Sequence, residues 1–290
     1  MRGMSSTDQR GDHALTAVSN DGAFRVIVAR TTETARGVIA AQGVTGRTAH
    51  HLADMVTGTI LVRLTMSPAY RVQGIARGAD QKGFLLADSY PDGFTRGLVK
   101  AGGGDVHFGP GAQMQVMRTL MNGSTHQGVV EVSQSHGVSG ALMNYMLESE
   151  QVTSAIGVDH VVTEAGIAIA SGYIVQVLPE CTDPPLAVMY ERLRNDFADY
   201  ASVATRFAGD PATILSEILY GMDFTKTQDH ELGYRCRCSS ERVLASLATI
   251  GKSDLEDMIR AAEPLFITCD YCNTPYEVSA EALRGLLTAS

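Results

Sequence analysis

The sequence lacks a long uninterrupted apolar run, and this absence argues against a membrane span. Its longest apolar stretch, MVTGTILVRLTM, is short and is interrupted by Arg63, whereas a spanning helix needs about 20 consecutive apolar residues. The N-terminal stretch MRGMSSTDQRGDHALTAV contains no apolar core of the kind that a signal peptide has. We therefore expect a cytoplasmic protein with no membrane partner.

Basic residues are also scarce. The chain has 23 Lys and Arg residues against 32 Asp and Glu residues, which gives a formal net charge of −9 and a pI of about 5.3. Proteins that bind nucleic acid need a positively charged surface that neutralises phosphates. The charge balance therefore predicts no nucleic-acid partner.

Cysteine is scarce as well, but four of the five cysteines are clustered. Cys236 and Cys238 form a CxC motif in YRCRCSSERV, and Cys269 and Cys272 form a CxxC motif in TCDYCNTPYEV, with thirty residues between the two motifs. In a reducing compartment, clustered cysteines are more often metal ligands or redox-active groups than structural disulfides. The cluster therefore indicates a metal site, a redox device, or both.

The length and the local patterns predict an α+β fold in three regions. A chain of 290 residues with 44% hydrophobic residues is at the size where one core begins to divide into domains. We expect an N-terminal α+β domain over residues 1–183, with a mostly antiparallel sheet and helices. A helical linker over residues 184–232 and a small C-terminal zinc-binding module over residues 233–290 follow it.

The N-terminal region is predicted to combine strands and turns with a buried helix. FRVIVART alternates as a strand does, whereas TAHHLADMVTGTILVRL is apolar nearly all round and predicts a buried helix within residues 34–66. Asn122-Gly123, between two apolar runs, is a strong hairpin signal. Pro91-Asp92-Gly93 is a weaker one.

The following block, residues 186–232, is helical by pattern. Asp210 and Pro211 suit the N-cap and the first position of a helix. Six apolar residues of the block fall on one helical face: Leu186, Met189, Tyr190, Leu193, Phe197 and Tyr200.

The spacing of the four cysteines predicts a tetrathiolate metal site. Residues i and i+2 of an extended chain face the same side, so CxC presents two sulfurs to one point, and a CxxC turn does the same. Asn273 tolerates the left-handed conformation that such a turn often needs. Zn²⁺ suits four thiolates best, with iron as a possible substitute. Within the insert, Ser253 and Glu256 predict a capping box, and Gly251 the end of the preceding helix.

The same residues suggest redox chemistry. Residues 233–290 contain few large apolar side chains, and modules of this size usually need a metal or disulfides in order to fold. A disulfide within CxC is strained and is readily reduced again. Arg235, Arg237 and Arg242 would favour thiolate character in cysteines that hold no metal. An oxidant could therefore convert four thiolates into two reversible disulfides, expel the metal and unfold the module.

With these motifs in place, the chain resembles the redox-regulated heat shock protein 33 family of holdase chaperones. The resemblance rests on the CxC and CxxC pair, on YMLESEQV with Ser149, Glu150 and Gln151, on SGYIVQVLPE and on FITCDYCNTPYEV. It extends over most of the chain from about Phe24. Cys181 is outside the family motif, and we interpret it as a small half-buried residue.

The resemblance implies a chaperone that is not an enzyme, needs no ATP and responds to oxidative stress and mild heat. The reduced, zinc-bound monomer would be inactive. Peroxide or hypochlorite would form the disulfides Cys236–Cys238 and Cys269–Cys272 and release zinc. The module and the redox-sensitive linker would then lose order and uncover apolar surface that holds unfolding client proteins, and the active form would be a homodimer built on the N-terminal domain.

Two other functional classes remain open from the residues alone. A zinc-ribbon module that binds nucleic acid is one, although residues 233–290 carry more acidic than basic residues, which opposes phosphate binding. A thiol oxidoreductase that uses Cys269 and Cys272 is the other, although such a site places CxxC at the start of a helix and would leave the CxC pair unexplained.

Overall fold

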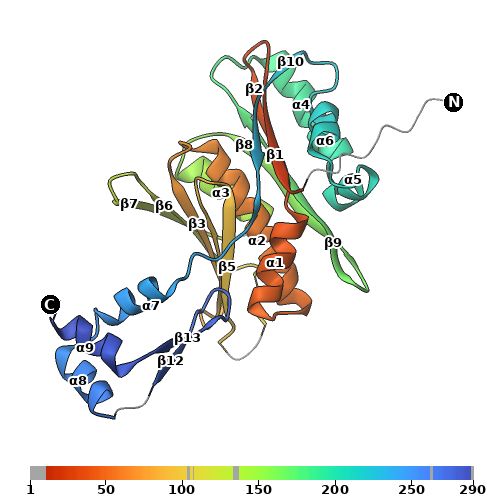
Figure 1. The fold of residues 1–290 in the computed structure, drawn as a ribbon. Helices are drawn as coiled ribbons and strands as arrows, with labels where there is room; N and C mark the ends of the chain where they lie inside the picture. Colours follow the sequence, from red (N-terminus) through yellow and green to blue (C-terminus); the bar gives the residue numbers. More distant parts are fainter. Residues whose placement is uncertain (1–10, 103–104, 107, 133–136, 262–263, 289–290) are drawn as a thin grey trace. The chain divides into compact units, whose positions relative to one another are not determined.

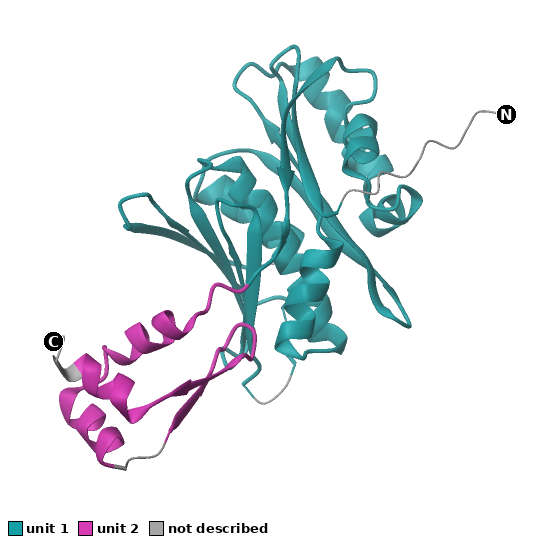
Figure 2. Cartoon of the chain, in the orientation of Figure 1, with its two compact units in different colours: residues 1–235 teal, residues 236–290 magenta. Residues whose placement is uncertain are grey.

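The computed structural model describes residues 11–102, 105–106, 108–132, 137–261 and 264–288. The first ten residues of the N-terminal stretch considered above lie outside this range. The chain forms two compact units, residues 1–235 and residues 236–290 (Figure 2).

The first sheet of unit 1 is antiparallel and has the strand order β10-β1-β2-β9-β8 (Figure 1). Its strands are β1 (His13–Ser19), β2 (Phe24–Arg30), β8 (Ser154–Thr163), β9 (Gly166–Val177) and β10 (Phe224–Glu231). Strand β2 contains the alternating FRVIVAR segment, as predicted. Its two faces enter different clusters of buried residues, with Ile27 and Ala29 in one and Val26 and Val28 in the other.

The second sheet has the order β11-β5-β4-β3-β6-β7. Its strands are β3 (Arg71–Arg77), β4 (Phe84–Ser89), β5 (Phe94–Lys100), β6 (Gln113–Thr119), β7 (Thr125–Glu131) and β11 (Gly233–Tyr234). Both predicted hairpins are present, because β6 pairs with β7 around Asn122-Gly123 and β4 pairs with β5 around Pro91-Asp92-Gly93. The pairing of β11 with β5 is parallel.

Helix α2 (Gly46–Thr65) is the buried helix that the sequence predicts, and every residue from Met55 to Leu64 is buried. It contacts strands of both sheets, so its apolar circumference is covered on two sides. Helix α1 (Thr32–Gln42) packs on α2, and α3 (Gly137–Glu148) packs on α2 and β8. The mixed α+β fold with antiparallel sheets is therefore confirmed.

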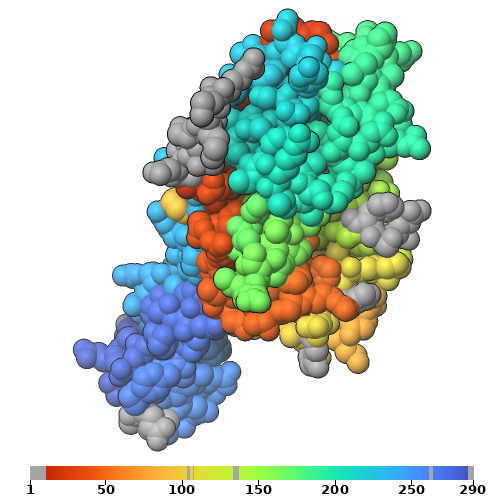
Figure 3. Space-filling model, turned by 90° about the vertical axis from the view of Figure 1, so that its right-hand side faces the viewer, coloured from red at the N-terminus to blue at the C-terminus, as the bar shows by residue number. Residues whose placement is uncertain are grey.

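The segment after β9 is helical only in part. It contains α4 (Asp183–Asp196), α5 (Tyr200–Arg206) and α6 (Pro211–Ile218). Helix α6 begins as predicted, because the Asp210 carboxylate accepts a hydrogen bond of 2.8 Å from the Thr213 backbone N–H. Helices α5 and α6 pack on strands of the first sheet, and the three helices lie together on one face of unit 1 (green to cyan in Figure 3).

The predicted helical pattern is wrong for residues 224–231, which form strand β10 along β1. Most side chains of β10 are exposed, so its sequence shows no apolar alternation. Pairing with β1, at a distance of about two hundred residues along the chain, decides the conformation in place of local propensity.

Residues 224–235 join the two sheets of unit 1. Strand β10 pairs with β1, and β11 immediately afterwards pairs with β5. The Arg235 guanidinium then lies over the Phe94 ring, with its central carbon 3.4 Å from the ring centroid.

Unit 2 contains α7 (Ser240–Leu247), α8 (Lys252–Ala261), β12 (Leu265–Thr268), β13 (Pro275–Val278) and α9 (Ala280–Thr288). Its buried apolar cluster consists of Leu247, Leu255, Val278 and Leu283. The expected capping box is wrong, because α8 already begins at Lys252 and the Gly251 carbonyl accepts from the Asp254 and Leu255 N–H groups. Ser253 is therefore inside the helix.

Candidate metal centre

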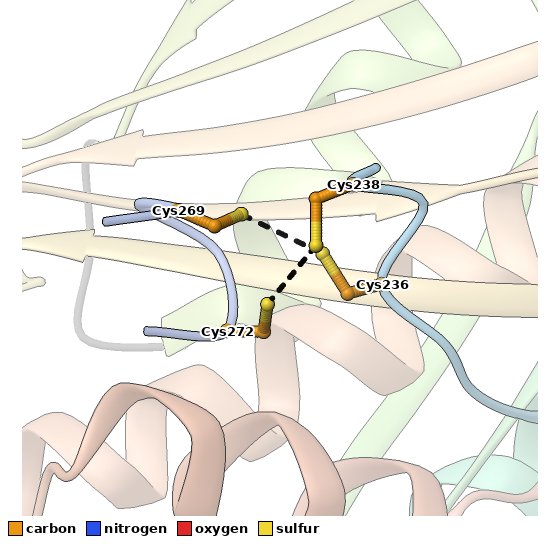
Figure 4. A group of neighbouring side chains, drawn as sticks. All are labelled: Cys236, Cys238, Cys269 and Cys272. Carbon is orange, nitrogen blue, oxygen red and sulfur yellow. Dashed lines mark hydrogen bonds between the residues drawn. The ribbon is translucent and has the colours of Figure 1, made fainter. Parts of the chain in front are cut away.

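The four clustered cysteines converge in unit 2. Cys236 and Cys238 lie in the extended segment before α7, and Cys269 and Cys272 lie in the turn between β12 and β13 (Figure 4). The four sulfur atoms all lie within 4.8 Å of one another. The Sγ atoms of Cys236 and Cys269 are 3.8 Å apart, and those of Cys238 and Cys272 are 3.3 Å apart.

The β12–β13 hairpin positions the CxxC pair. Thr268 is paired with Pro275 at the end of the ladder, and the Cys269 N–H donates to the Thr274 carbonyl over 2.9 Å. The Asn273 N–H donates to the Cys269 carbonyl over 2.8 Å, and Asn273 has a φ of 56°. The left-handed residue that the sequence predicts here is confirmed, and it turns the chain so that both sulfurs face the same side.

Hydroxyl groups from the same hairpin contact the sulfur atoms. The Thr274 Oγ1 is 3.1 Å from the Cys272 Sγ, and the Tyr276 hydroxyl donates to the Cys238 Sγ over 3.0 Å. Tyr276 is a site residue that sequence reasoning missed. The motif contains no signal for it, because only the pairing of Tyr276 with Ile267 places this ring beside the CxC segment.

The cysteine pKa values diverge within the cluster. Burial raises the pKa of Cys236 to about 12 and also raises the pKa of Cys269. Burial acts in the same direction on Cys272, but hydrogen bonds from the Thr274 side chain and backbone and from neighbouring sulfurs outweigh it and lower the pKa to about 7. Because the raised pKa values of Cys236 and Cys269 favour protonated thiols near neutral pH, holding four thiolates together requires a cation.

The sequence predicts that nearby arginines favour the thiolate form of the cysteines, but arginines are not what lowers the pKa of Cys272. The Arg242 Nη1 donates to the Arg237 carbonyl over 2.8 Å, and Arg235 is stacked on Phe94. The low pKa of Cys272 comes instead from the hydrogen bonds with Thr274 and with other cysteines.

The sulfur geometry fits a four-coordinate metal ion. A tetrahedral centre with metal–sulfur bonds of about 2.3 Å has sulfur–sulfur distances of about 3.8 Å. The sulfur pairs Cys236–Cys269 and Cys238–Cys272, at 3.8 Å and 3.3 Å, lie near this value. Cys236, Cys238, Cys269 and Cys272 could therefore hold a metal ion.

Cys181 is separate from this group. It lies in unit 1, just before α4, where it is half-buried and packs at the periphery of a cluster of buried apolar residues. Burial and the charges of Asp21 and Asp183 raise the pKa of its thiol. The interpretation of Cys181 as a half-buried packing residue is consistent with this position.

Glu150 of the YMLESEQV motif has a structural role in unit 1. Its carboxylate accepts hydrogen bonds from the Arg118 guanidinium, at 2.7 Å and 2.9 Å, and from the Tyr145 hydroxyl, at 2.6 Å. Burial and this carboxylate raise the pKa of Tyr145. Glu150 thereby ties the end of α3 to strand β6.

A titratable pair connects α2 to β8 in unit 1. The His160 Nδ1 is 2.7 Å from the Asp54 Oδ1, and the His50 ring packs on His160 with 4.8 Å between the ring centroids. Burial raises the pKa of Asp54 to about 6, against the effect of His160. Burial lowers the pKa of His160, but the Asp54 hydrogen bond and the charges of Asp54 and Asp159 outweigh it, so that the net pKa is raised.

These features define a class: an α+β protein whose two-sheet unit is followed by a small unit built around four convergent cysteines. Residues 12–279 match the model of the family described as Hsp33 protein, and the chain belongs to this family. It is a family of chaperones, and membership implies unfolded proteins as binding partners.

Curated relatives have the same extent. The chain is 28% identical to the 33 kDa chaperonin of Syntrophotalea carbinolica, over 95% of this chain and 99% of that protein. It is 26% identical to the 33 kDa chaperonin of Clostridioides difficile, over 95% of this chain and 98% of that protein.

A solved structure is similar in fold. The crystal structure of the 33 kDa chaperonin, a heat shock protein 33 homolog, from Thermotoga maritima superposes with a TM-score of 0.81 at 20% identity. The superposition covers 97% of this chain and 99% of that one. Within the described ranges, no helix has the length and apolar character needed to cross a bilayer.

Proposed function

We propose that this protein is a redox-regulated, ATP-independent holdase that is inactive when reduced and metal-bound and becomes active on oxidation. The observation that carries the proposal is the convergence of the four cysteine sulfurs within 4.8 Å. A chaperone that needs only to hold clients would not require such a cluster, whereas a thiol switch would.

Zinc is the metal that we propose for the cluster. Four thiolate ligands with near-tetrahedral spacing suit Zn²⁺, which has no redox chemistry of its own. Bound Zn²⁺ would supply the positive charge that keeps four thiolates together and would hold the CxC segment against the β12–β13 hairpin. Because the apolar cluster of unit 2 is small, metal binding would be coupled to the folding of this unit.

Oxidation would remove these ligands in a balanced reaction. Each pair of thiolates gives two electrons to one peroxide molecule, and with two protons this yields one disulfide and two molecules of water. By family resemblance we propose the pairs Cys236–Cys238 and Cys269–Cys272. Each pair lies within one motif, whereas the sulfur contacts of 3.8 Å and 3.3 Å join different motifs, so the pairing requires peptide mapping.

The response of the rest of the chain follows from its packing. We propose that residues 184–232 act as a redox-sensitive linker, because α4 already exposes Leu186, Val188 and Tyr190. Loss of order there would uncover the buried side chains Met189, Phe197 and Ile214. Such surface would bind unfolded clients and would also favour a homodimer. We propose the cytoplasm as the compartment, since a reducing environment keeps the cluster metal-bound until stress.

The test combines activity and metal release. Reduced and peroxide-treated full-length protein are added to an unfolding client, aggregation is followed by light scattering, and zinc is followed with a chelating dye. Suppression that arises only after oxidation and tracks zinc loss supports the proposal. Zinc release without suppression would show that the cluster is only a structural clip.

A further inference from the structure

A small pocket in unit 1 is lined by polar side chains from several elements. Its polar residues are Arg63 at the end of α2, Arg25 on β2, and Gln228 and His230 on β10, and Leu64, Met66 and Pro68 complete the wall. Its volume is about 180 Å³, below the roughly 300–1,000 Å³ of pockets for drug-sized ligands. This size suits a small ion with a few water molecules.

Arg63 is the unusual member of this set. The residue is 2% exposed, and its Nε and Nη2 atoms are buried without a hydrogen-bond partner among the described residues. Burying a charged group without compensation is strongly unfavourable. The fork of donors on a guanidinium matches the oxygens of an anion. A ligand that accepts hydrogen bonds from Arg63 would therefore satisfy these buried donors.

Strand register places the other polar groups on the same face of the first sheet. Arg25 pairs with Val18, and Gln228 pairs with Thr16, so the side chains of these four residues and of His230 share one face. The same face includes Ile27, which belongs to the apolar cluster that contains α2. Thr16 Oγ1, on this face, is also buried without a hydrogen-bond partner among the described residues.

The electrostatics of the pocket favour negative charge. Arg25 donates to the Thr65 carbonyl over 2.8 Å and so already neutralises the end of α2. Burial lowers the pKa of Arg63, an effect that the charge of Asp92 only partly offsets. Burial and the charge of Arg63 also lower the pKa of His230. Two cationic side chains and an imidazole thus surround the same space in a chain whose net charge is negative.

We propose that this pocket binds a small oxyanion of the phosphate class, with Arg63 as its principal ligand and Arg25, Gln228 and His230 around it. Free phosphate and the phosphoryl group of a larger molecule share this chemistry. The pocket is formed entirely by residues of unit 1, so the proposal stands independently of the cysteine cluster and of the redox switch.

Calorimetric titration of the full-length, reduced, zinc-loaded protein tests the site. The probes are inorganic phosphate, glycerol phosphate as a phosphomonoester, and acetate, each at constant ionic strength with chloride as the balancing ion. Arg63→Gln removes the positive charge and the guanidinium that would bind the anion. Arg63→Lys keeps the positive charge but lacks the paired N–H donors of the guanidinium. Arg47→Gln is the matched control, because Arg47 is an exposed arginine on the same helix.

We expect saturable phosphate binding that Arg63→Gln weakens by about tenfold or more, the effect of losing a charge-assisted hydrogen bond. Arg63→Lys should weaken it less, and it carries the test if the Gln variant does not fold. Arg47→Gln should leave it unchanged. Equal binding of phosphate and glycerol phosphate would indicate an open phosphoryl site, and binding of phosphate alone would indicate a site for the free ion.

Three outcomes would overturn the proposal. No binding to the wild-type protein would show that only water solvates Arg63. Unchanged binding in both Arg63 variants would place the anion elsewhere. Acetate that binds as tightly as phosphate would contradict the assignment to the phosphate class.

Discussion

The hydrogen-bonded pair of Asp54 and His160 should make the stability of unit 1 depend on pH, and Asp54→Asn removes the source of this dependence. Both side chains are mostly buried, with 16% of the Asp54 and 15% of the His160 side chain exposed. The folded-state pKa of Asp54 is about 6, against an ordinary value of 3.8. The native protein therefore binds more protons than the unfolded chain between these two values.

The sign and magnitude follow from this difference. A shift of about 2 pKa units corresponds to about 3 kcal/mol. Because the folded pKa is raised, this stability is present below pH 4 and is lost as the pH rises to about 6. His160 acts in the same direction, since its folded pKa is also raised and its contribution disappears as the pH rises above about 6.5. The free energy of unfolding should thus fall across the range from pH 4 to pH 7.

Urea unfolding at several pH values, followed by tyrosine fluorescence, measures this dependence. Asp54→Asn should flatten the curve and should be more stable than the wild-type protein at pH 8, by up to about 3 kcal/mol. The exposed Asp196 provides a control, because Asp196→Asn should leave the slope unchanged. A variant Asp54→Asn with the wild-type slope between pH 4 and pH 6 would refute the reasoning.

Three further predictions concern the cysteine cluster and the end of α3. Cys238→Ser should weaken zinc binding strongly in a competition with a chelating dye, whereas Cys181→Ser should change it little; equal losses would mean that the ligand assignment is wrong. Tyr276→Phe removes one hydrogen bond to Cys238 and should speed peroxide-induced zinc release without abolishing zinc binding, as the same dye would report. Glu150→Gln should lower the free energy of urea unfolding by about 1–3 kcal/mol, because it weakens bonds to Arg118 and Tyr145; an unchanged midpoint would contradict the proposed tie.

The sequence predicts the parts of the fold that depend on short-range pattern. Helix α2 contacts both sheets, and its residues from Met55 to Leu64 are all buried. Because most of these consecutive residues are apolar, the local sequence is enough to predict a helix that is buried all round. The hairpin at Asn122-Gly123 depends on two residues with special backbone preferences, and Gly123 has a φ of 81°. Strand β10 could not be predicted in this way, because its exposed polar side chains carry no periodicity and only its pairing with β1 makes it a strand.

In the candidate metal centre, too, some residues can be predicted from the sequence and others depend on tertiary contacts. The four cysteines are predictable because CxC and CxxC each bring two sulfurs together locally. A small module without a large apolar core needs a metal or disulfides in order to fold, and this need predicts that the two pairs meet in one site. Tyr276 was not predictable, because its contact with Cys238 depends on how the hairpin meets a segment almost forty residues earlier. In the sequence, Arg63 indicates only the interruption of an apolar stretch; that its Nε and Nη2 atoms have no hydrogen-bond partner among the described residues depends on the tertiary packing around it.

The stretch from Phe224 to Tyr234 is the outermost strand of one sheet and then of the other. If it detaches when the adjoining cysteines are oxidised, β1 becomes an edge strand with a free row of backbone N–H and C=O groups, and β5 loses the short pairing at Phe94 and Thr95. Such edges accept any extended peptide, because main-chain hydrogen bonds are indifferent to side-chain identity. The edge of β1 would then be open along its length, and an unfolded client could be held by strand addition as well as by apolar contact.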